Sequence, residues 1–334
     1  MTQLVLLLLS RYKPEKKEQV PSFDELQREL ETEILELFGR VNCNAFSVAN
    51  DVTNAAVGIG MFPEGALFNH DCDPNCVVSF NEREMRVHVV RDVEVGEELT
   101  VSYVELMQST KARRKELKES YFFDCECKRC QAAIAGQMNE DWYLDGFQCS
   151  SKDCESFGGV VVMDTSFDGG FVASCKRCGV ARSSEEILAY EREIESLDVP
   201  KADSEAMMWE KYQRKWEIGM NQLRLHPRNT RVAALARDIG NFLLDTTSSE
   251  LHALQFFLAE LHAVEWLLPK TKLPSRGLLH FQIGKLLFDE ASSGVSMLPV
   301  KQADRVKQAA KHLQEALSVY VLIPTFLSCR QLVY

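Results

Sequence analysis

The cysteines constrain this chain more than any other feature of its sequence. There are eleven of them, an odd number, and Cys125, Cys127 and Cys130 form the pattern Cys-x-Cys-x-x-Cys. No secretory signal precedes them, so close spacing of this kind predicts metal thiolates rather than a disulfide framework. Zn²⁺ binds four deprotonated soft ligands in a tetrahedron. The pattern therefore supplies three ligands of a zinc site and needs a fourth from elsewhere, unless these are simply free buried cysteines.

A second set of cysteines follows the first. Its members are Cys149, Cys154, Cys175 and Cys178, and a glycine-rich hairpin from Gly158 to Gly170 separates the two pairs. Two cysteine pairs on either side of a hairpin are typical of a zinc ribbon. The five-residue step from Cys149 to Cys154 is wider than the usual zinc knuckle. We expect a second zinc site here.

Composition excludes several classes of protein. The chain has 334 residues, 46% of them hydrophobic and 26% charged, with a net charge of −11. That is an ordinary globular composition, and the negative charge argues against a protein that coats nucleic acid or an anionic membrane. The longest strongly apolar run, Leu4 to Leu9, is far shorter than the roughly 20 residues of a membrane span and lacks signal-peptide features. We expect an intracellular protein, in the nucleus or the cytoplasm.

Hydrophobic periodicity divides the chain into regions. Residues 22–38 predict a helix with Ser22 and Glu25 in capping-box spacing and Gly39 at its end, whereas residues 41–105 alternate as short strands with a turn at Gly96. Residues 106–123 predict a charged helix. From about residue 184 the period is helical almost to the end, and four prolines punctuate it: Pro227, Pro269, Pro274 and Pro299. Helix pairs of this kind predict an array similar to tetratricopeptide repeats, although no clean 34-residue repeat is visible.

Three motifs occur in a fixed order. They are Asn69-His70-Asp71-Cys72-Asp73-Pro74-Asn75-Cys76, then Gly96-Glu97-Glu98-Leu99-Thr100-Val101-Ser102-Tyr103, then Cys125-Glu126-Cys127-Lys128-Arg129-Cys130. In this order and spacing they resemble the C-terminal half of a SET domain with its post-SET zinc site, over about residues 40–130. The match is closest to the SET-and-MYND branch of the protein-lysine methyltransferases.

This resemblance implies a set of site residues. Cys72 is the implied fourth ligand of the post-SET zinc, and Tyr103 is the implied catalytic tyrosine, with Tyr121 as a second pocket tyrosine. The residues that match the family's S-adenosylmethionine contacts are Asn44, Asn69, His70 and Phe123. Phe46 is expected to line the lysine channel. Apart from the resemblance, Tyr103 is an ordinary strand tyrosine, Asn44 a turn residue, and Phe46 and Phe123 core residues.

The implied reaction has physical requirements of its own. Methyl transfer to an amine is an in-line displacement, so donor carbon and nucleophile must be aligned and the amine must be neutral. Free lysine has a pKa near ~10.4, and desolvation together with a neighbouring sulfonium cation lowers it.

The sequence departs from the family in two respects. The residue between His70 and Cys72 is Asp71 instead of the usual small polar residue. The family's early Gly-x-Gly stretch and its MYND finger have no counterpart, because Gly58-Ile59-Gly60 lies at a different place and is weak evidence by itself. We therefore expect a chain that lacks part of the SET domain.

Together these observations predict an α+β protein with a SET-like β core, a post-SET zinc site, a zinc-ribbon-like insertion and a C-terminal helical array. The expected divisions are 1–105, 106–135, 140–182 and 184–334. The expected function is S-adenosylmethionine-dependent methylation of a lysine in a protein substrate, with Zn²⁺ as a structural cofactor. This activity is expected to be impaired if part of the SET domain is missing. The alternatives are a zinc-containing interaction scaffold that binds protein partners through its helices, and a fragment that does not fold stably because its sheet edges are uncovered.

Overall fold

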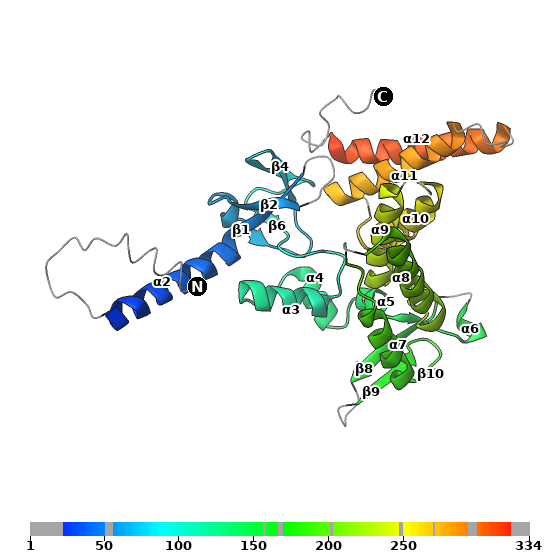
Figure 1. Ribbon diagram of the computed structural model, residues 1–334, viewed down its shortest axis with the longest axis horizontal. Coiled ribbons are helices and arrows are strands. Elements are labelled where there is room, and N and C mark those ends of the chain that lie inside the picture. The colour runs from blue at the N-terminus through cyan, green and yellow to red at the C-terminus, as the bar shows by residue number, and fades with distance from the viewer. Residues whose placement is uncertain are drawn as a thin grey trace.

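The computed structural model describes residues 23–50, 56–155, 158–165, 170–200, 203–246, 250–269, 271–292 and 299–321. A long N-terminal helix leads into a β-rich part, which is followed by a cysteine-rich part and a series of packed helices (Figure 1). The expected mixture of helix and sheet with a helical C-terminal region is confirmed. No helix among the described residues is long and apolar enough to span a membrane.

The first helix, α2, spans Phe23–Asn44 and extends away from the rest of the molecule (Figure 1). The prediction that it ends at Gly39 is wrong. A glycine inside a helix costs only about 0.5–1 kcal/mol, less than the hydrogen bonds lost by stopping there. At the actual end, the Asn44 side-chain amide donates to the carbonyl of Arg40 (2.7 Å) and satisfies one of the terminal acceptors. On its apolar face Ile34 is buried, whereas Leu37 is 60% exposed; Ser22 lies outside the described residues.

The β-rich part consists of short strands in three pairs. The strands are β1 (Ala45–Ala49), β2 (Ala56–Met61), β3 (Asn69–His70), β4 (Cys76–Asn81), β5 (Glu84–Val89) and β6 (Thr100–Val101), with a 3-10 turn η1 (Gly65–Leu67) between β2 and β3. β1 pairs with β2 and β4 with β5 in antiparallel fashion, whereas β3 and β6 run parallel. Gly96 adopts a φ of +89° in the turn before β6, a conformation that favours glycine. The strands predicted over residues 41–105 are therefore present.

The cysteine-rich part connects the two halves of the molecule. Its elements are α3 (Thr110–Tyr121), α4 (Lys128–Ile134), α5 (Glu140–Asp145), β7 (Phe147–Gln148), α6 (Lys152–Glu155), β8 (Val160–Thr165), β9 (Phe171–Cys175) and β10 (Ala181–Arg182). The last four strands form one antiparallel sheet in the order β10-β9-β8-β7. β8 and β9 form the hairpin expected between the two cysteine pairs.

The helical part follows. Its elements are α7 (Ser184–Ser196), α8 (Glu205–Glu217), the π-helical turn η2 (Ile218–Gln222), α9 (Thr230–Asp245), α10 (Glu250–Leu267), α11 (Pro274–Ser292) and α12 (Pro299–Tyr320). The prolines stand at the helix boundaries as predicted, because Pro274 and Pro299 are the first residues of α11 and α12, where a missing N–H costs nothing. Neighbouring helices along the chain pack on one another, and buried leucine, isoleucine, alanine and phenylalanine side chains fill the space between them.

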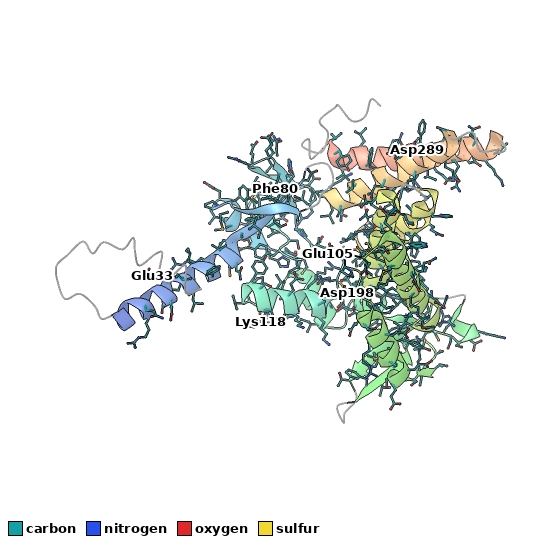
Figure 2. All side chains as sticks on the ribbon, in the orientation of Figure 1. Glu33, Phe80, Glu105, Lys118, Asp198 and Asp289 are labelled. Carbon is teal, nitrogen blue, oxygen red and sulfur yellow. The ribbon has the colours of Figure 1, made fainter. Side chains whose placement is uncertain are left out.

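The helical part also packs against the β-rich part. Val77 on β4 shares a buried cluster with Ala316, Val319 and Tyr320 on α12. Glu105 lies between the two parts (Figure 2), and the next residue, Leu106, is buried in the core of the helices. The segment that carries Tyr103 is thus anchored on its C-terminal side by the helical core.

Two glycines in helices provide a test of this packing. A Cβ at Gly240 in α9 would lie 2.7–3.0 Å from the ring of Phe257, which is fully buried, whereas a Cβ at Gly39 would meet nothing within 4 Å. Gly240→Ala should therefore destabilise the protein by about 1–3 kcal/mol through overpacking. Gly39→Ala should be neutral or stabilising by up to about 1 kcal/mol. Thermal denaturation followed by circular dichroism measures both, and equal effects of the two substitutions would contradict the packing of α9 on α10.

Candidate active site and metal centres

Two of the sequence motifs are joined by backbone pairing and by one buried asparagine. β3 and β6 place Asn69 opposite Thr100 and His70 opposite Val101. Asn75 is 1% exposed; its amide donates to the carbonyl of Glu98 (2.8 Å), and its side-chain oxygen accepts from the N–H of Thr100 (2.8 Å). A buried amide with its polar atoms satisfied fixes the register of the segments it joins. The motif around Asn69 and the motif that ends at Tyr103 therefore form one unit.

A cavity of about 470 Å³ opens beside this unit. It lies between the end of α2, β1, β4 and the end of α3. Four of the predicted site residues line it: Asn44, Phe46, Tyr103 and Tyr121. Its volume is within the range of small-molecule sites, and its lining combines aromatic rings with a few hydroxyl groups.

Tyr103 is fixed by hydrogen bonds of both its side chain and its backbone. Its hydroxyl donates to the carbonyl of Phe68 (2.5 Å), and its backbone N–H donates to Nδ1 of His70 (3.0 Å). Its ring lies 4.8 Å from the ring of Tyr121, measured between centroids. Burial raises the pKa of Tyr103 above its usual value, with further contributions from Tyr121 and Glu98, so the phenol is neutral at physiological pH.

The other predicted cofactor contacts lie around the cavity rather than in its wall. His70 and Phe123 pack against Tyr103, with ring centroids 5.4 and 6.5 Å from it. Asn69 is exposed, and its amide donates to the carboxylate of Glu98 (2.6 Å). The structure thus brings His70, Phe123, Tyr103 and Tyr121 into one aromatic group, while the side chain of Asn69 is engaged by Glu98.

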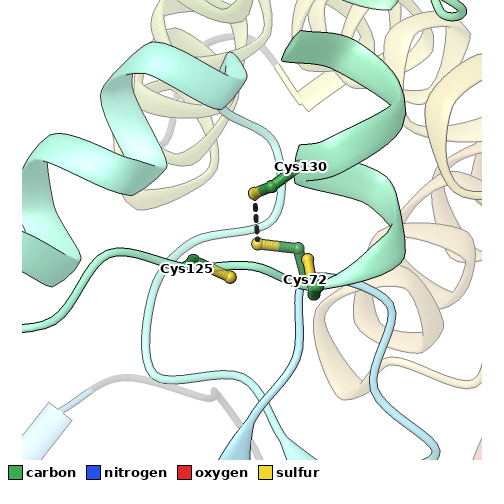
Figure 3. Close-up of side chains that lie close together, drawn as sticks. Cys72, Cys125 and Cys130 are labelled. Carbon is green, nitrogen blue, oxygen red and sulfur yellow. Dashed lines mark hydrogen bonds between the residues drawn. The ribbon is translucent and has the colours of Figure 1, made fainter. Parts of the chain in front are cut away.

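The post-SET cysteines and Cys72 meet in space. The four sulfurs of Cys72, Cys125, Cys127 and Cys130 all lie within 4.8 Å of one another. Figure 3 shows the side chains of Cys125 and Cys130 directed toward Cys72, and the sulfurs of Cys72 and Cys130 are 3.6 Å apart. That separation is too long for a disulfide of about 2.05 Å. It matches the roughly 3.8 Å between sulfurs of a tetrahedral zinc site with Zn–S bonds of about 2.3 Å.

His70 connects this cluster to Tyr103. Burial lowers the pKa of His70 to about 4, with Arg113 adding to the effect and Cys127 opposing it, so the ring is neutral at pH 7. Nδ1 accepts the hydrogen bond from the Tyr103 N–H, so the ring proton must be on Nε2. Nε2 lies 3.2 Å from Sγ of Cys72 and donates to it. One imidazole therefore joins the sulfur cluster to the backbone of the predicted catalytic tyrosine.

Sequence reasoning missed two residues that support this arrangement. Arg113 is completely buried, and its Nε donates to Sγ of Cys72 (3.3 Å) while its other nitrogens bind Gln108 and Thr110. A buried arginine beside four thiolates offsets the negative charge that a zinc tetrathiolate carries. The second is Asn75, described above. The only signal in the sequence for the role of Arg113 was its position in the charged helix predicted over residues 106–123.

The ribbon cysteines form a second cluster. The sulfurs of Cys149, Cys154, Cys175 and Cys178 lie within 4.8 Å of one another, with Cys149 and Cys178 3.6 Å apart and Cys154 and Cys175 3.9 Å apart. Backbone N–H groups of Ser151 and Arg177 donate to two of the sulfurs, at 3.4 Å each, as in zinc knuckles. A Cβ at Gly159 would lie 2.8 Å from Sγ of Cys154, so this position requires glycine. Both donor sets fit zinc.

Metal content tests both clusters. The wild-type chain should contain about two zinc ions, one for each set of four thiolates. Cys72→Ser should reduce the content to about one, because it removes a ligand of the post-SET site. Cys76→Ser is the matched control: Cys76 is equally buried but lies outside both clusters, so its zinc content should remain at two. Elemental analysis of the purified variants gives the counts, and a Cys72→Ser protein that keeps two zinc ions would contradict the assignment.

Comparisons with known proteins identify a family and relatives that are similar to part of this chain. Residues 6–104 match the family described as SET domain, so the match begins upstream of the region indicated by the motifs. Histone-lysine N-methyltransferase SMYD3 from Homo sapiens is 43% identical over 99 residues, which make up 30% of this chain and 23% of that protein. Histone-lysine N-methyltransferase ASHR1 from Arabidopsis thaliana is 35% identical over 156 residues, 46% of this chain and 31% of that protein. N-lysine methyltransferase SMYD2 from Gallus gallus is 40% identical over 94 residues, 28% of this chain and 21% of that protein.

The matched segments thus span between about a fifth and a third of these relatives' lengths. The SET match over residues 6–104 includes Tyr103 and the Asn69–Cys76 motif. Residues 6–104 therefore match a SET domain, and part of this chain is similar in sequence to the SMYD methyltransferases.

Proposed function

We propose that this protein transfers a methyl group from S-adenosylmethionine to the side-chain amine of a lysine in a protein substrate. The observation that carries the proposal is the cavity lined by Tyr103, Tyr121, Asn44 and Phe46 in a region whose relatives are named as lysine methyltransferases. The relatives named as histone-lysine enzymes support a protein substrate in the nucleus or the cytoplasm.

The residues in and around the cavity would have different roles in the reaction. S-adenosylmethionine, when bound, supplies the methyl group as an electrophile. The neutral hydroxyl of Tyr103 would orient the lysine amine for in-line attack, and the rings of Phe46 and Tyr121 would strip water from it. Desolvation favours the neutral, nucleophilic amine, whose proton passes to solvent before attack. Asn44, Asn69, His70 and Phe123 are the residues proposed to hold the cofactor.

The zinc sites would act structurally. The post-SET site joins Cys72 to the segment after Tyr121, so it would fix both sides of the aromatic group around Tyr103. We also propose that the helical part contacts protein partners or the substrate protein, since its helix α12 packs against β4, the strand that contributes Val78 and Phe80 to the cavity. An interaction scaffold without catalysis remains the competing function, and the following measurements separate the two.

Cofactor binding is the first test. Isothermal titration of the zinc-loaded chain with S-adenosylmethionine should give saturable heat, and Asn69→Ala should weaken binding by about tenfold or more, the effect of losing a hydrogen bond in a buried complex. The matched control is Asn139→Ala, because Asn139 is exposed and caps α5 without a side-chain hydrogen bond. Absence of heat from the wild-type chain would favour the scaffold.

Catalysis by Tyr103 is the second test. Tyr103→Phe removes the hydroxyl and should lower kcat for methyl transfer to histone proteins by roughly 100-fold, as expected for the loss of one positioned hydrogen-bonding group. Tyr212→Phe is the control, since Tyr212 packs in the helical core, away from the cavity. Transfer of radiolabelled methyl groups measures both rates. A Tyr103→Phe protein with the wild-type kcat would exclude the proposed role.

A further inference from the structure

A second cavity, of about 490 Å³, lies between the ribbon and the helical part. The residues that line it are Tyr143, Gln148, Cys149, Cys154, Gly158, Gly159, Arg224, His226, Pro227, Arg228 and His262. They come from α5, β7, α6, the loop after η2 and α10, and none of them lines the cavity beside Tyr103. This cavity therefore has no part in the proposed methyl transfer.

The described lining of this cavity is rich in basic side chains. It includes two arginines and two histidines but no aspartate or glutamate, together with the thiols of Cys149 and Cys154. Arg231, three residues after Arg228, pairs with the carboxylate of Glu191 at 2.9 Å. Within the described residues, Arg224 and Arg228 form no such ion pair. Two arginines without carboxylate partners around one cavity indicate a candidate site for an anion.

Arg228 is held in place by aromatic rings rather than by acids. Its guanidinium carbon lies 4.6 Å from the ring centroid of Trp266 and 5.5 Å from that of Tyr143. Its Nε is buried and has no hydrogen-bond partner among the described residues. Stacking fixes the plane of a guanidinium and leaves its edge available for hydrogen bonds. Arg228 is therefore an oriented donor without an acceptor.

The loop that carries these residues is itself constrained. Arg224 has a φ of +54°, a left-handed conformation that is uncommon for residues other than glycine. The N–H of His226 donates to the carbonyl of Gly146 (3.1 Å), and the buried Asn229 caps α9 through the N–H of Arg231 (2.9 Å). Backbone conformations of this kind persist where the surrounding structure fixes them, often at binding sites. The loop thus holds Arg224 and Arg228 on the wall of the cavity before any ligand arrives.

We propose that this cavity binds a phosphate monoester dianion. Guanidinium groups bind phosphate oxygens in bidentate fashion, and a phosphate ester offers three acceptor oxygens and nearly two negative charges. The cavity is far larger than a phosphate group, so it also has room for the group that carries it, beside the ring of Tyr143. The source is either a phosphorylated serine in a peptide or free phosphate.

One competing explanation has to be separated from this proposal. Cys149 and Cys154 also line the cavity, and the Arg224 guanidinium donates to the carbonyl of Cys149 (3.5 Å). The two arginines would then serve only to offset the charge of the ribbon thiolates. In that case Arg228→Ala would lower the affinity for zinc, and no phosphate would bind.

The test uses the full zinc-loaded chain. Isothermal titration is performed with inorganic phosphate, with a phosphoserine peptide acetyl-Gly-pSer-Gly-amide and with the same peptide carrying glutamate in place of phosphoserine. Saturable binding of at least one phosphate probe, with a Kd below about 1 mM, supports the proposal. Comparison of the phosphopeptide with inorganic phosphate identifies the source. Equal binding of the glutamate peptide, or no binding of either phosphate probe to the wild-type chain, overturns it.

Variants locate the bound anion. Arg228→Ala should weaken phosphate binding at least about tenfold, because it removes a charged donor. Arg228→Lys should also weaken it, because lysine keeps the charge but not the stacked plane. Arg192→Ala is the control: Arg192 is an exposed arginine on α7 whose side chain bonds only to the carbonyl of Leu188. An equal loss in Arg192→Ala would show non-specific attraction and overturn the proposal. Circular dichroism and zinc content show whether each variant is folded. If Arg228→Ala does not fold, Arg224→Ala takes its place in the test.

Discussion

The convergence of Cys72 with Cys125, Cys127 and Cys130 is the constraint on which the site depends. These sulfurs come from two segments that are far apart in the chain, and Cys72 immediately follows the β3 strand that pairs with β6. Once the sulfurs share a metal, the loop after β3 cannot move independently of the segment after α3. The aromatic group around Tyr103 is attached to these segments, because His70 lies on β3, Tyr103 follows its partner strand β6, and Tyr121 and Phe123 precede Cys125.

Charge compensation around this cluster explains why an arginine is completely buried. Burying Arg113 alone would be very costly, and so would burying four thiolates alone. Placed together, each reduces the cost of the other, and the hydrogen bond from Nε to Cys72 gives the pair a fixed geometry. His70 adds a neutral donor to the same sulfur. Both residues thus bond to Cys72, the ligand that comes from the distant segment.

Much of this arrangement was predictable from local sequence. Cysteine spacing predicted the ribbon cluster and three ligands of the post-SET cluster, whereas the fourth, Cys72, was implied by the family resemblance. Prolines indicated the breaks before α11 and α12, and alternation predicted the strands β5 and β6. Long-range features were not predictable from spacing alone. Gly39 did not end α2, because the signal for the end is the side chain of Asn44 bonding back to Arg40. The engagement of Asn69 by Glu98, the burial of Arg113 and the cavity around Arg228 all depend on segments that meet only in three dimensions.

The two clusters differ in how much of the chain must be organised before each can form. Cys149 and Cys178 are 29 residues apart, whereas Cys72 and Cys130 are 58 residues apart. Doubling the loop adds only about 0.6 kcal/mol of closure entropy. The larger difference is structural, because the ribbon ligands lie on one hairpin and its flanks, whereas Cys72 follows β3, which pairs with β6, and its three partners follow α3. Zinc binding by the ribbon therefore requires one formed hairpin, and zinc binding by the post-SET cluster requires several separate segments of the SET-like part to be assembled.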